Sequence, residues 1–256
     1  MVSKKNVRAY LTEFIGTFFV VFVTCWSFTS LELGQIGYLS LGIANAVIMA
    51  ACVWVGVNNS GAHFNPVVSL VNWYIIGMDA RKAFMYIFVQ LLGSMLAALL
   101  VIMFIPSDLQ QNLETFIGFP KFSVIISDFQ AFVIEFILSM FYIFVYFATV
   151  VDKRAPKSVF GFALGAVILM GSISVGAYTN ACINPARIFG PYLLIGRTAN
   201  AMVYWTANIS GGIFAGFYYN FFLLRNAEFD GFEDNLEKKD NMMNMENIHE
   251  AMNLKY

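Results

Sequence analysis

Long apolar runs are the most regular feature of the chain. Each run approaches the roughly 20 residues that an α-helix needs to cross the ~30 Å hydrocarbon core of a bilayer. More polar connections separate one run from the next. The runs cover residues 10–29, 38–57, 83–105, 129–151, 158–178 and 200–224. This pattern predicts a multi-pass integral membrane protein with six transmembrane helices, an all-α fold embedded in the lipid bilayer.

Composition supports this prediction and excludes other classes. The chain is 59% hydrophobic and only 12% charged, against roughly 25% charged residues in soluble globular proteins. A net charge of -1 without a long basic run argues against a nucleic-acid partner. The three widely separated cysteines predict neither a disulfide framework nor a metal site. The sequence also has no nucleophile and base set and no phosphate loop, so we expect no cofactor and no enzyme activity.

Basic residues collect in alternate connections. They precede the first and third runs, join the fourth to the fifth, and end the sixth at Arg225. Because cytoplasmic connections carry the excess of Lys and Arg, we expect both termini to be cytoplasmic. The expected organisation is an N-terminal segment at 1–9, a membrane domain at 10–225, and an acidic, then Asn/Met-rich cytoplasmic tail at 226–256.

The membrane domain contains an internal repeat. Glu13 and Glu135 each lie inside an apolar run, and Asn-Pro pairs follow at Asn65 and Asn184, 52 and 49 residues later. Repeat one covers 10–105 and repeat two 129–225. Because each repeat has three spans, the second is inverted relative to the first. Such repeats typically place a site near the bilayer midplane.

Each Asn-Pro pair predicts the start of a short helix. Asn is a favoured N-cap, and Pro is favoured at the first helical position. A cap whose oxygen accepts backbone N–H bonds leaves its NH₂ group free to bind a passing oxygen. A single such pair is usually an ordinary turn, but two at matching positions favour two re-entrant half-helices. The irregular stretches before them would line a wet cavity with carbonyl groups, at Gly61, Ala62, His63, Asn180 and Cys182.

With these motifs the chain resembles the aquaporin family, also called major intrinsic proteins, over residues 8–224. SGAHFNPVVSL and ACINPARIFGP resemble the two family boxes, TEFIGTF and IEFILS the acidic helix starts, and YWTANISGGIFAG the last span. The resemblance implies six tilted helices plus two re-entrant half-helices, assembled as a homotetramer with a pore in each subunit. The pore boxes would be Asn65, Pro66 and Val67, and Asn184, Pro185 and Ala186. Val67 stands where the family usually has Ala, and we expect a modest packing change there.

The resemblance also places a selectivity filter, at Asn45, Ser172, Ala181 and Arg187. Arg187 matches the family, whereas the other three are smaller than the residues of strictly water-selective or glycerol-type filters. A wider opening favours passage of urea, ammonia, hydrogen peroxide or glycerol. Ile188, where glycerol facilitators carry Asp, and Tyr204-Trp205 favour water. We therefore expect a passive channel for water and small neutral solutes that excludes ions and protons.

Several residues have a second interpretation. The resemblance favours a structural role for Glu13 and Glu135 as hydrogen-bond acceptors for the Asn-Pro loops, whereas proton coupling would make the protein a secondary transporter. His63 would lend its carbonyl to the pore or act as a protonation gate. Cys182 lies near the pore and is a candidate for mercurial modification. A non-conducting junction protein of the same fold is the remaining alternative.

Overall fold

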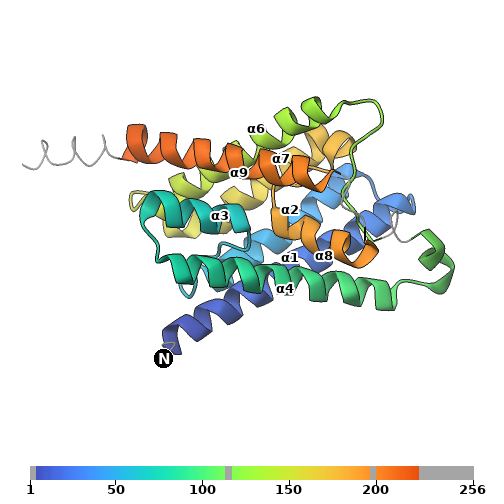
Figure 1. The fold of residues 1–256 in the computed structure, drawn as a ribbon, viewed down its shortest axis with the longest axis horizontal. Helices are drawn as coiled ribbons and strands as arrows, with labels where there is room; N and C mark the ends of the chain where they lie inside the picture. The colour runs from blue at the N-terminus through green and yellow to red at the C-terminus, as the bar shows by residue number, and fades with distance from the viewer. Residues whose placement is uncertain (1–3, 113–116, 197–199, 225–256) are drawn as a thin grey trace, which may run out of the picture. The chain divides into compact units, whose positions relative to one another are not determined.

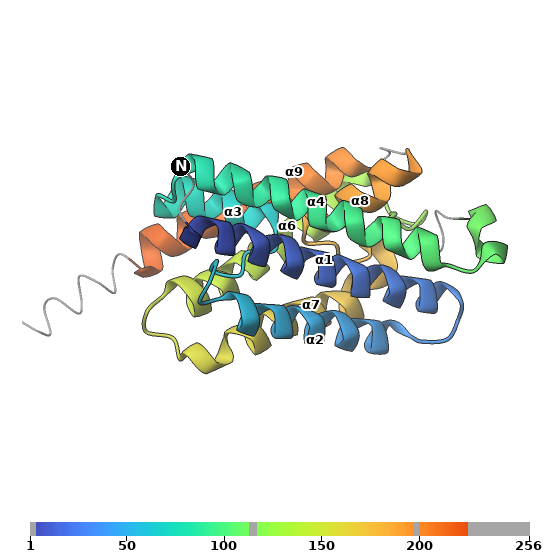
Figure 2. The ribbon, with the colours of Figure 1, turned by 90° about the horizontal axis from the view of Figure 1, so that it is seen from below.

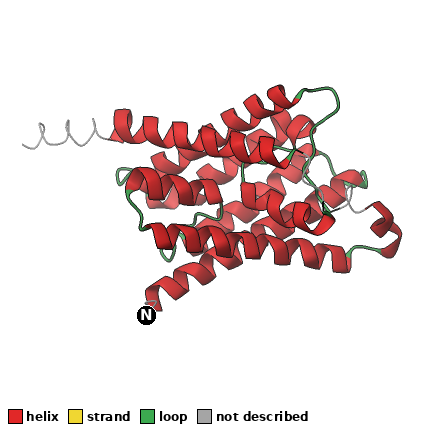
Figure 3. Ribbon diagram, in the orientation of Figure 1, coloured by secondary structure: helices red, strands yellow, loops and turns green. Residues whose placement is uncertain are grey.

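The computed structural model describes residues 4–112, 117–196 and 200–224. Within these ranges the chain is helical and has no strand (Figure 3). The predicted cytoplasmic tail at 226–256 and Arg225 lie outside the described residues.

Six long helices follow the six predicted apolar runs. They are α1 (Lys4–Glu32), α2 (Tyr38–Gly56), α4 (Ala80–Phe104), α6 (Asp128–Tyr146), α7 (Phe160–Thr179) and α9 (Ala201–Tyr218). All but α9 are apolar enough over their length to qualify as membrane spans by composition. The helix α9 has 18 residues, and its polar Thr206, Asn208 and Ser210 lower its hydropathy. The first helix begins at Lys4, six residues before the predicted run.

Two short helices start at the Asn-Pro pairs. They are α3 (Pro66–Val71), which continues as a π-helical turn at Asn72–Ile76, and α8 (Pro185–Ile195). Gly77 and Gly196 follow them in the left-handed conformation, which is a common helix stop. Two further π-helical turns follow α6 and α9, at Phe147–Val151 and Tyr219–Leu224, and 3₁₀ turns lie at Ser107–Asn112 and Lys157–Val159.

The helices pack in pairs that reflect the repeat. The helix α1 packs along α4, and α2 packs along α7, as Figure 2 shows. The half-helix α8 lies against α4, and α3 contacts both α4 and α8 (Figure 1). The α2 and α7 pair therefore joins the second helix of one repeat to the second helix of the other.

In each repeat, a glycine allows the first and the last long helix to approach closely. A Cβ atom on Gly93 of α4 would lie 2.5 Å from the Phe14 carbonyl oxygen of α1, and one on Gly211 of α9 would lie 2.3 Å from that of Phe136 in α6. Phe14 and Phe136 each follow the acidic residue of their repeat. Small residues at such crossings are typical of membrane helix packing. At these crossings Glu13 and Glu135 lie beside the loops that precede Asn65 and Asn184.

The chain divides into two units, residues 1–216 and 217–256. The site described below lies entirely in the first unit. The described part of the second unit comprises the end of α9 and the π-helical turn at Tyr219–Leu224.

Candidate functional site

The two half-helices begin with the same capping geometry. The Oδ1 atom of Asn65 accepts a 2.9 Å hydrogen bond from the Val67 amide, and Oδ1 of Asn184 accepts one of 2.9 Å from the Ala186 amide. Pro66 and Pro185 fill the first helical positions, where a missing N–H leaves no bond unmade. Both Asn side chains are therefore fixed in direction by the start of their own helix.

The two caps also bond to each other's loops. Asn65 donates from Nδ2 to the Ile183 carbonyl oxygen at 3.2 Å, and Asn184 donates from Nδ2 to the Phe64 carbonyl oxygen at 2.8 Å. Because an NH₂ group carries two hydrogens, each Asn keeps one N–H beyond this cross-link. The sequence indicated the caps and the outward NH₂ groups but gave no sign of the reciprocal bonds.

The loop backbone before each Asn repeats one unusual conformation. The φ angles are 51° at Ala62 and 47° at Phe64, and 44° at Ala181 and 59° at Ile183. These are the third and first residues before Asn65 and Asn184. Left-handed φ angles are costly for residues with a side chain and persist only where the surroundings impose them.

Two buried carboxylates stabilise these loops. Glu13 accepts hydrogen bonds from the His63 amide at 2.9 Å and the Phe64 amide at 2.7 Å. Glu135 accepts them from the Cys182 amide at 2.8 Å and the Ile183 amide at 2.9 Å. Both side chains are fully buried. Each carboxylate satisfies two amides of an irregular loop that has no helix to satisfy them.

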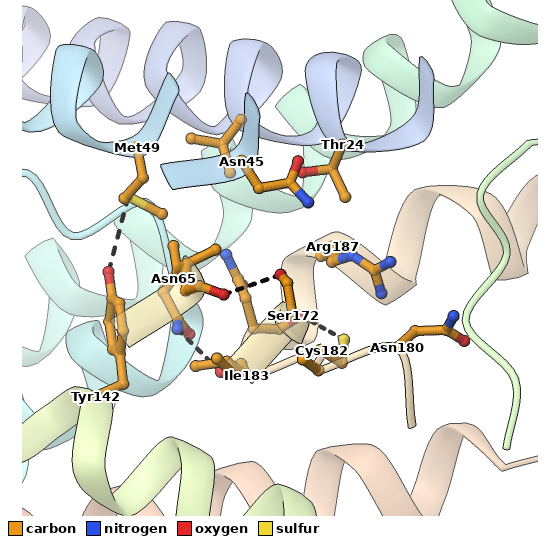
Figure 4. Close-up of a pocket in the computed structure, with 14 residues that line it drawn as sticks. Thr24, Asn45, Met49, Asn65, Tyr142, Ser172, Asn180, Cys182, Ile183 and Arg187 are labelled. Atoms are coloured by element: carbon orange, nitrogen blue, oxygen red, sulfur yellow. Dashed lines mark hydrogen bonds between the residues drawn. The ribbon is translucent and has the colours of Figure 1, made fainter. Parts of the chain in front are cut away.

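The proposed filter residues surround one cavity. Asn45, Ser172, Ala181 and Arg187 line it together with the caps Asn65 and Asn184 and with Asn180 and Cys182 (Figure 4). The space available to water centres is about 30 Å³, and one water needs roughly 10–15 Å³ on this measure. The cavity is therefore narrow and has room for about two water molecules.

Three of the predicted pore-lining residues are not among those that line this cavity. Gly61, Ala62 and His63 do not line this cavity. The His63 ring is buried, shares a 3.0 Å hydrogen bond with the Ser69 hydroxyl, and packs edge-on against Tyr86 at 5.0 Å between ring centroids. The imidazole thus takes part in the packing of the first half-helix.

The cavity wall includes residues that the sequence did not indicate. Val20 and Thr24 of α1, Met49 of α2 and Tyr142 of α6 also line it. Figure 4 labels Thr24 and Arg187 among the side chains that line this cavity. Thr24 is polar and almost fully buried, but a single threonine in the apolar run of α1 gives no sequence signal of a site.

Two residues of the cavity wall carry buried polar atoms without a partner. Within the described part of the chain, Nη1 and Nη2 of Arg187 and Oδ1 of Asn45 are buried without a hydrogen-bond partner. Buried polar groups are nearly always bonded, and an unbonded one is costly unless water or a solute reaches it. These donors and this acceptor are therefore available to molecules inside the cavity.

The unusual Val67 is accommodated by a glycine. Val67 is fully buried and does not line the cavity. A Cβ atom on Gly212 of α9 would lie only 2.2 Å from Cγ1 of Val67. The Val67 side chain therefore occupies the space that Gly212, which has no side chain, leaves open on α9.

The described residues hold no group of three potential metal ligands. The three cysteines are buried and unpaired by disulfides. The cavity wall combines amide, hydroxyl and guanidinium groups with apolar side chains and the Cys182 thiol.

Comparisons with known proteins agree on one family. The sequence model for "Major intrinsic protein" matches residues 1–219. Lens fiber major intrinsic protein of Lithobates pipiens is 32% identical over 219 residues, covering 84% of this chain and 81% of the relative. Aquaporin NIP1-1 of Oryza sativa subsp. japonica is 29% identical over 221 residues, covering 84% of this chain and 74% of the relative.

A solved structure has the same fold. The aquaglyceroporin from Plasmodium falciparum superposes with a TM-score of 0.76 at 23% sequence identity, covering 88% of this chain and 99% of that chain. The six long helices and two half-helices are thus arranged as in that protein.

Proposed function

The chain belongs to the major intrinsic protein family, whose model matches residues 1–219, and we propose that it conducts water together with small neutral solutes. As a member of this family it is an integral membrane channel and not an enzyme. The observation that carries this proposal is the meeting of the two capped half-helices. Asn65 and Asn184 line one cavity and each keeps one amide N–H after capping and cross-linking. These donors support binding of a water or hydroxyl oxygen in transit.

Exclusion of ions and protons is supported by positive charge at two levels of the cavity. The half-helices present their N-terminal ends, where the helix dipole is positive, through Asn65 and Asn184. Arg187 adds a fixed charge on the wall of the same cavity. Both features oppose cations and hydronium while offering donors to neutral oxygen-bearing molecules.

The proposed solute range follows from the small filter residues. Asn45, Ser172 and Ala181, which line the cavity with Arg187, carry no bulky aromatic group. That favours solutes wider than water, such as urea, ammonia, hydrogen peroxide or glycerol. Ile188 and Trp205 favour water as the main permeant, because glycerol facilitators carry Asp at the position of Ile188.

The decisive experiment is stopped-flow light scattering on proteoliposomes of the pure protein. Gradients of impermeant sugar, glycerol and urea would be applied beside empty liposomes. Fast shrinkage in sugar supports a water channel, and fast re-swelling in urea or glycerol supports the wider solute range. Flux no faster than in empty liposomes in every gradient would reject the proposal and favour a non-conducting junction protein.

A coupled transporter is a weaker candidate. It would need an intramembrane acid that is free to exchange protons, but Glu13 and Glu135 each already accept two backbone amide bonds. Uptake that saturates and follows a pH gradient would support the transporter.

We also propose that both termini are cytoplasmic and that the protein is a homotetramer. Basic residues near the start of α1, at the start of α4 and in the α6–α7 connection lie at one end of the helices (Figure 2), as the positive-inside rule requires for the cytoplasmic side. The tetramer rests on the family resemblance. Protease access to terminal tags in oriented vesicles and the mass of the detergent-solubilised protein test these two points.

A further inference from the structure

The guanidinium group of Arg187 lies on the face of an aromatic ring from α1. Its Cζ atom is 4.6 Å from the centroid of the Phe28 ring. Both residues are almost fully buried, with 5% of the Arg187 surface and 3% of the Phe28 surface exposed. Within the described residues, neither terminal nitrogen of Arg187 has a hydrogen-bond partner. The ring face therefore stabilises a buried charged group whose terminal nitrogens remain unbonded within the protein.

The ring contacts a residue of the cavity wall, Arg187, but does not itself line the cavity. Thr24 lies one helical turn before Phe28 on α1 and lines the cavity with Arg187. Asn45 of α2 also lines it, and its Oδ1 atom is a buried acceptor without a partner. An unbonded charged donor and an unbonded acceptor thus share one narrow space. A direct bond between the two groups would satisfy both and leave neither for a solute.

We propose that Phe28 is a positioning residue for the filter, which stacks on the Arg187 guanidinium and keeps it from crossing the cavity to Asn45. The stack holds the charge against α1 and leaves its terminal nitrogens and the Asn45 oxygen to passing solutes. The inference rests on the proposed channel function and adds to it a residue that keeps the constriction open. Loss of the ring would let Arg187 bond Asn45 and narrow the pore.

The test compares three substitutions on one helix. Phe28→Leu keeps an apolar side chain but removes the ring, and Phe28→Tyr keeps the ring. Phe22→Leu is the matched control, because Phe22 packs on a separate apolar cluster of α1 and α4. A cation–π contact between two buried groups changes a population by about five- to thirty-fold. We therefore expect Phe28→Leu to lower water and urea flux per channel by about fivefold or more, with Phe28→Tyr recovering most of it.

A second substitution separates positioning from space-filling. Adding Asn45→Ala to Phe28→Leu removes the acceptor that would capture Arg187, and flux should rise relative to Phe28→Leu alone. If Phe28 only fills space, Asn45→Ala would not rescue flux. Equal flux in Phe28→Leu and Phe22→Leu, or the lack of rescue, would overturn the proposal.

A readout that is independent of flux distinguishes this proposal from the channel function itself. Ring currents of Phe28 shift the ¹⁵N and ¹H resonances of the Arg187 side chain, which Arg187→Lys assigns by loss of the signal. Phe28→Leu should move these resonances and Phe22→Leu should not. If the unsubstituted protein gave no flux, the proposed function would fail, while unmoved resonances in Phe28→Leu would reject the stack.

Discussion

The side-chain amide of Asn184 donates a 2.8 Å hydrogen bond to the backbone carbonyl of Phe64, 120 residues earlier in the chain. The bond joins the cap of the second half-helix to the loop that precedes the first. Its counterpart from Asn65 to Ile183 completes a pair of bonds between the two repeats. The point where the half-helices meet is therefore cross-linked through the same residues that we propose contact water.

Replacing Asn184 with Asp should nearly abolish water flux. A carboxylate cannot donate to the Phe64 carbonyl, so two oxygens would face each other in a buried site. An unmet buried polar group costs roughly 1–3 kcal/mol, and the added negative charge would hold cations. We expect water flux to fall about tenfold or more, measured by stopped-flow light scattering.

Asn59→Asp is the matched control for this change. The Asn59 side chain is exposed and donates to the Val55 carbonyl one turn earlier, so the same charge is added away from the cavity. Similar flux in the Asn184 and Asn59 variants would contradict the role proposed for Asn184.

Glu13→Gln and Glu135→Gln should lower the stability of the protein, and neither should abolish an uptake driven by a pH gradient. Each carboxylate accepts two loop amides, and a Gln amide replaces one accepting oxygen with a donor that faces an N–H. The expected loss is roughly 1–3 kcal/mol for each variant, seen as a lower midpoint of thermal unfolding in detergent. Glu32→Gln, at a half-exposed side chain 3.8 Å from the Lys121 ammonium, should have little effect.

The transporter alternative makes the opposite prediction for the same two variants. It requires uptake driven by a pH gradient in the unsubstituted protein and its loss in Glu13→Gln or Glu135→Gln at unchanged stability. That pair of results would restore proton coupling as the role of these acids.

The sequence predicted the fold because its signals are local and repeated. The lengths of the apolar runs, the two intramembrane acids and the two Asn-Pro pairs are all visible as spacing. It also indicated the half-helix starts, since capping by Asn65 and Asn184 depends on a residue and its immediate neighbours. The shape of the cavity depended on which faces of distant helices meet, and no spacing within one run encodes that.

For this reason the contribution of α1 to the cavity wall was missed, although Glu13 of the same helix was predicted. Thr24 and Phe28 lie in an apolar stretch where a Thr and a Phe are unremarkable, and only the packing against α8 places them beside Arg187. The left-handed backbone at Phe64 and Ile183 was hidden for a similar reason. Neither residue type favours that conformation, which is imposed by the buried carboxylates and the cross-link.

Gly212→Ala should disrupt the packing of the first half-helix, α3, against α9. The added methyl group would lie 2.2 Å from Cγ1 of Val67, and overpacking of this kind costs about 1–3 kcal/mol. Adding Val67→Ala removes the clash and should return the unfolding midpoint toward that of the unsubstituted protein. Gly37→Ala is a suitable control, because no atom lies within 4 Å of the added carbon. Additive effects of the two substitutions would show that Val67 and Gly212 do not compensate each other.

Asn45→Phe should restrict the channel to water. The phenyl ring would enter a cavity in which only about 30 Å³ is available to the centres of water molecules. A single water needs roughly 10–15 Å³ on this measure. It would also remove the unbonded Oδ1 acceptor. Urea is wider than water and needs both the space and the acceptor, so its flux should fall about tenfold more than that of water. Val47→Phe adds the same ring to an exposed face of α2 and should leave both fluxes unchanged. An unaltered ratio of urea to water flux in Asn45→Phe would mean that solute size is selected elsewhere in the pore, and the filter assignment of Asn45 would be wrong.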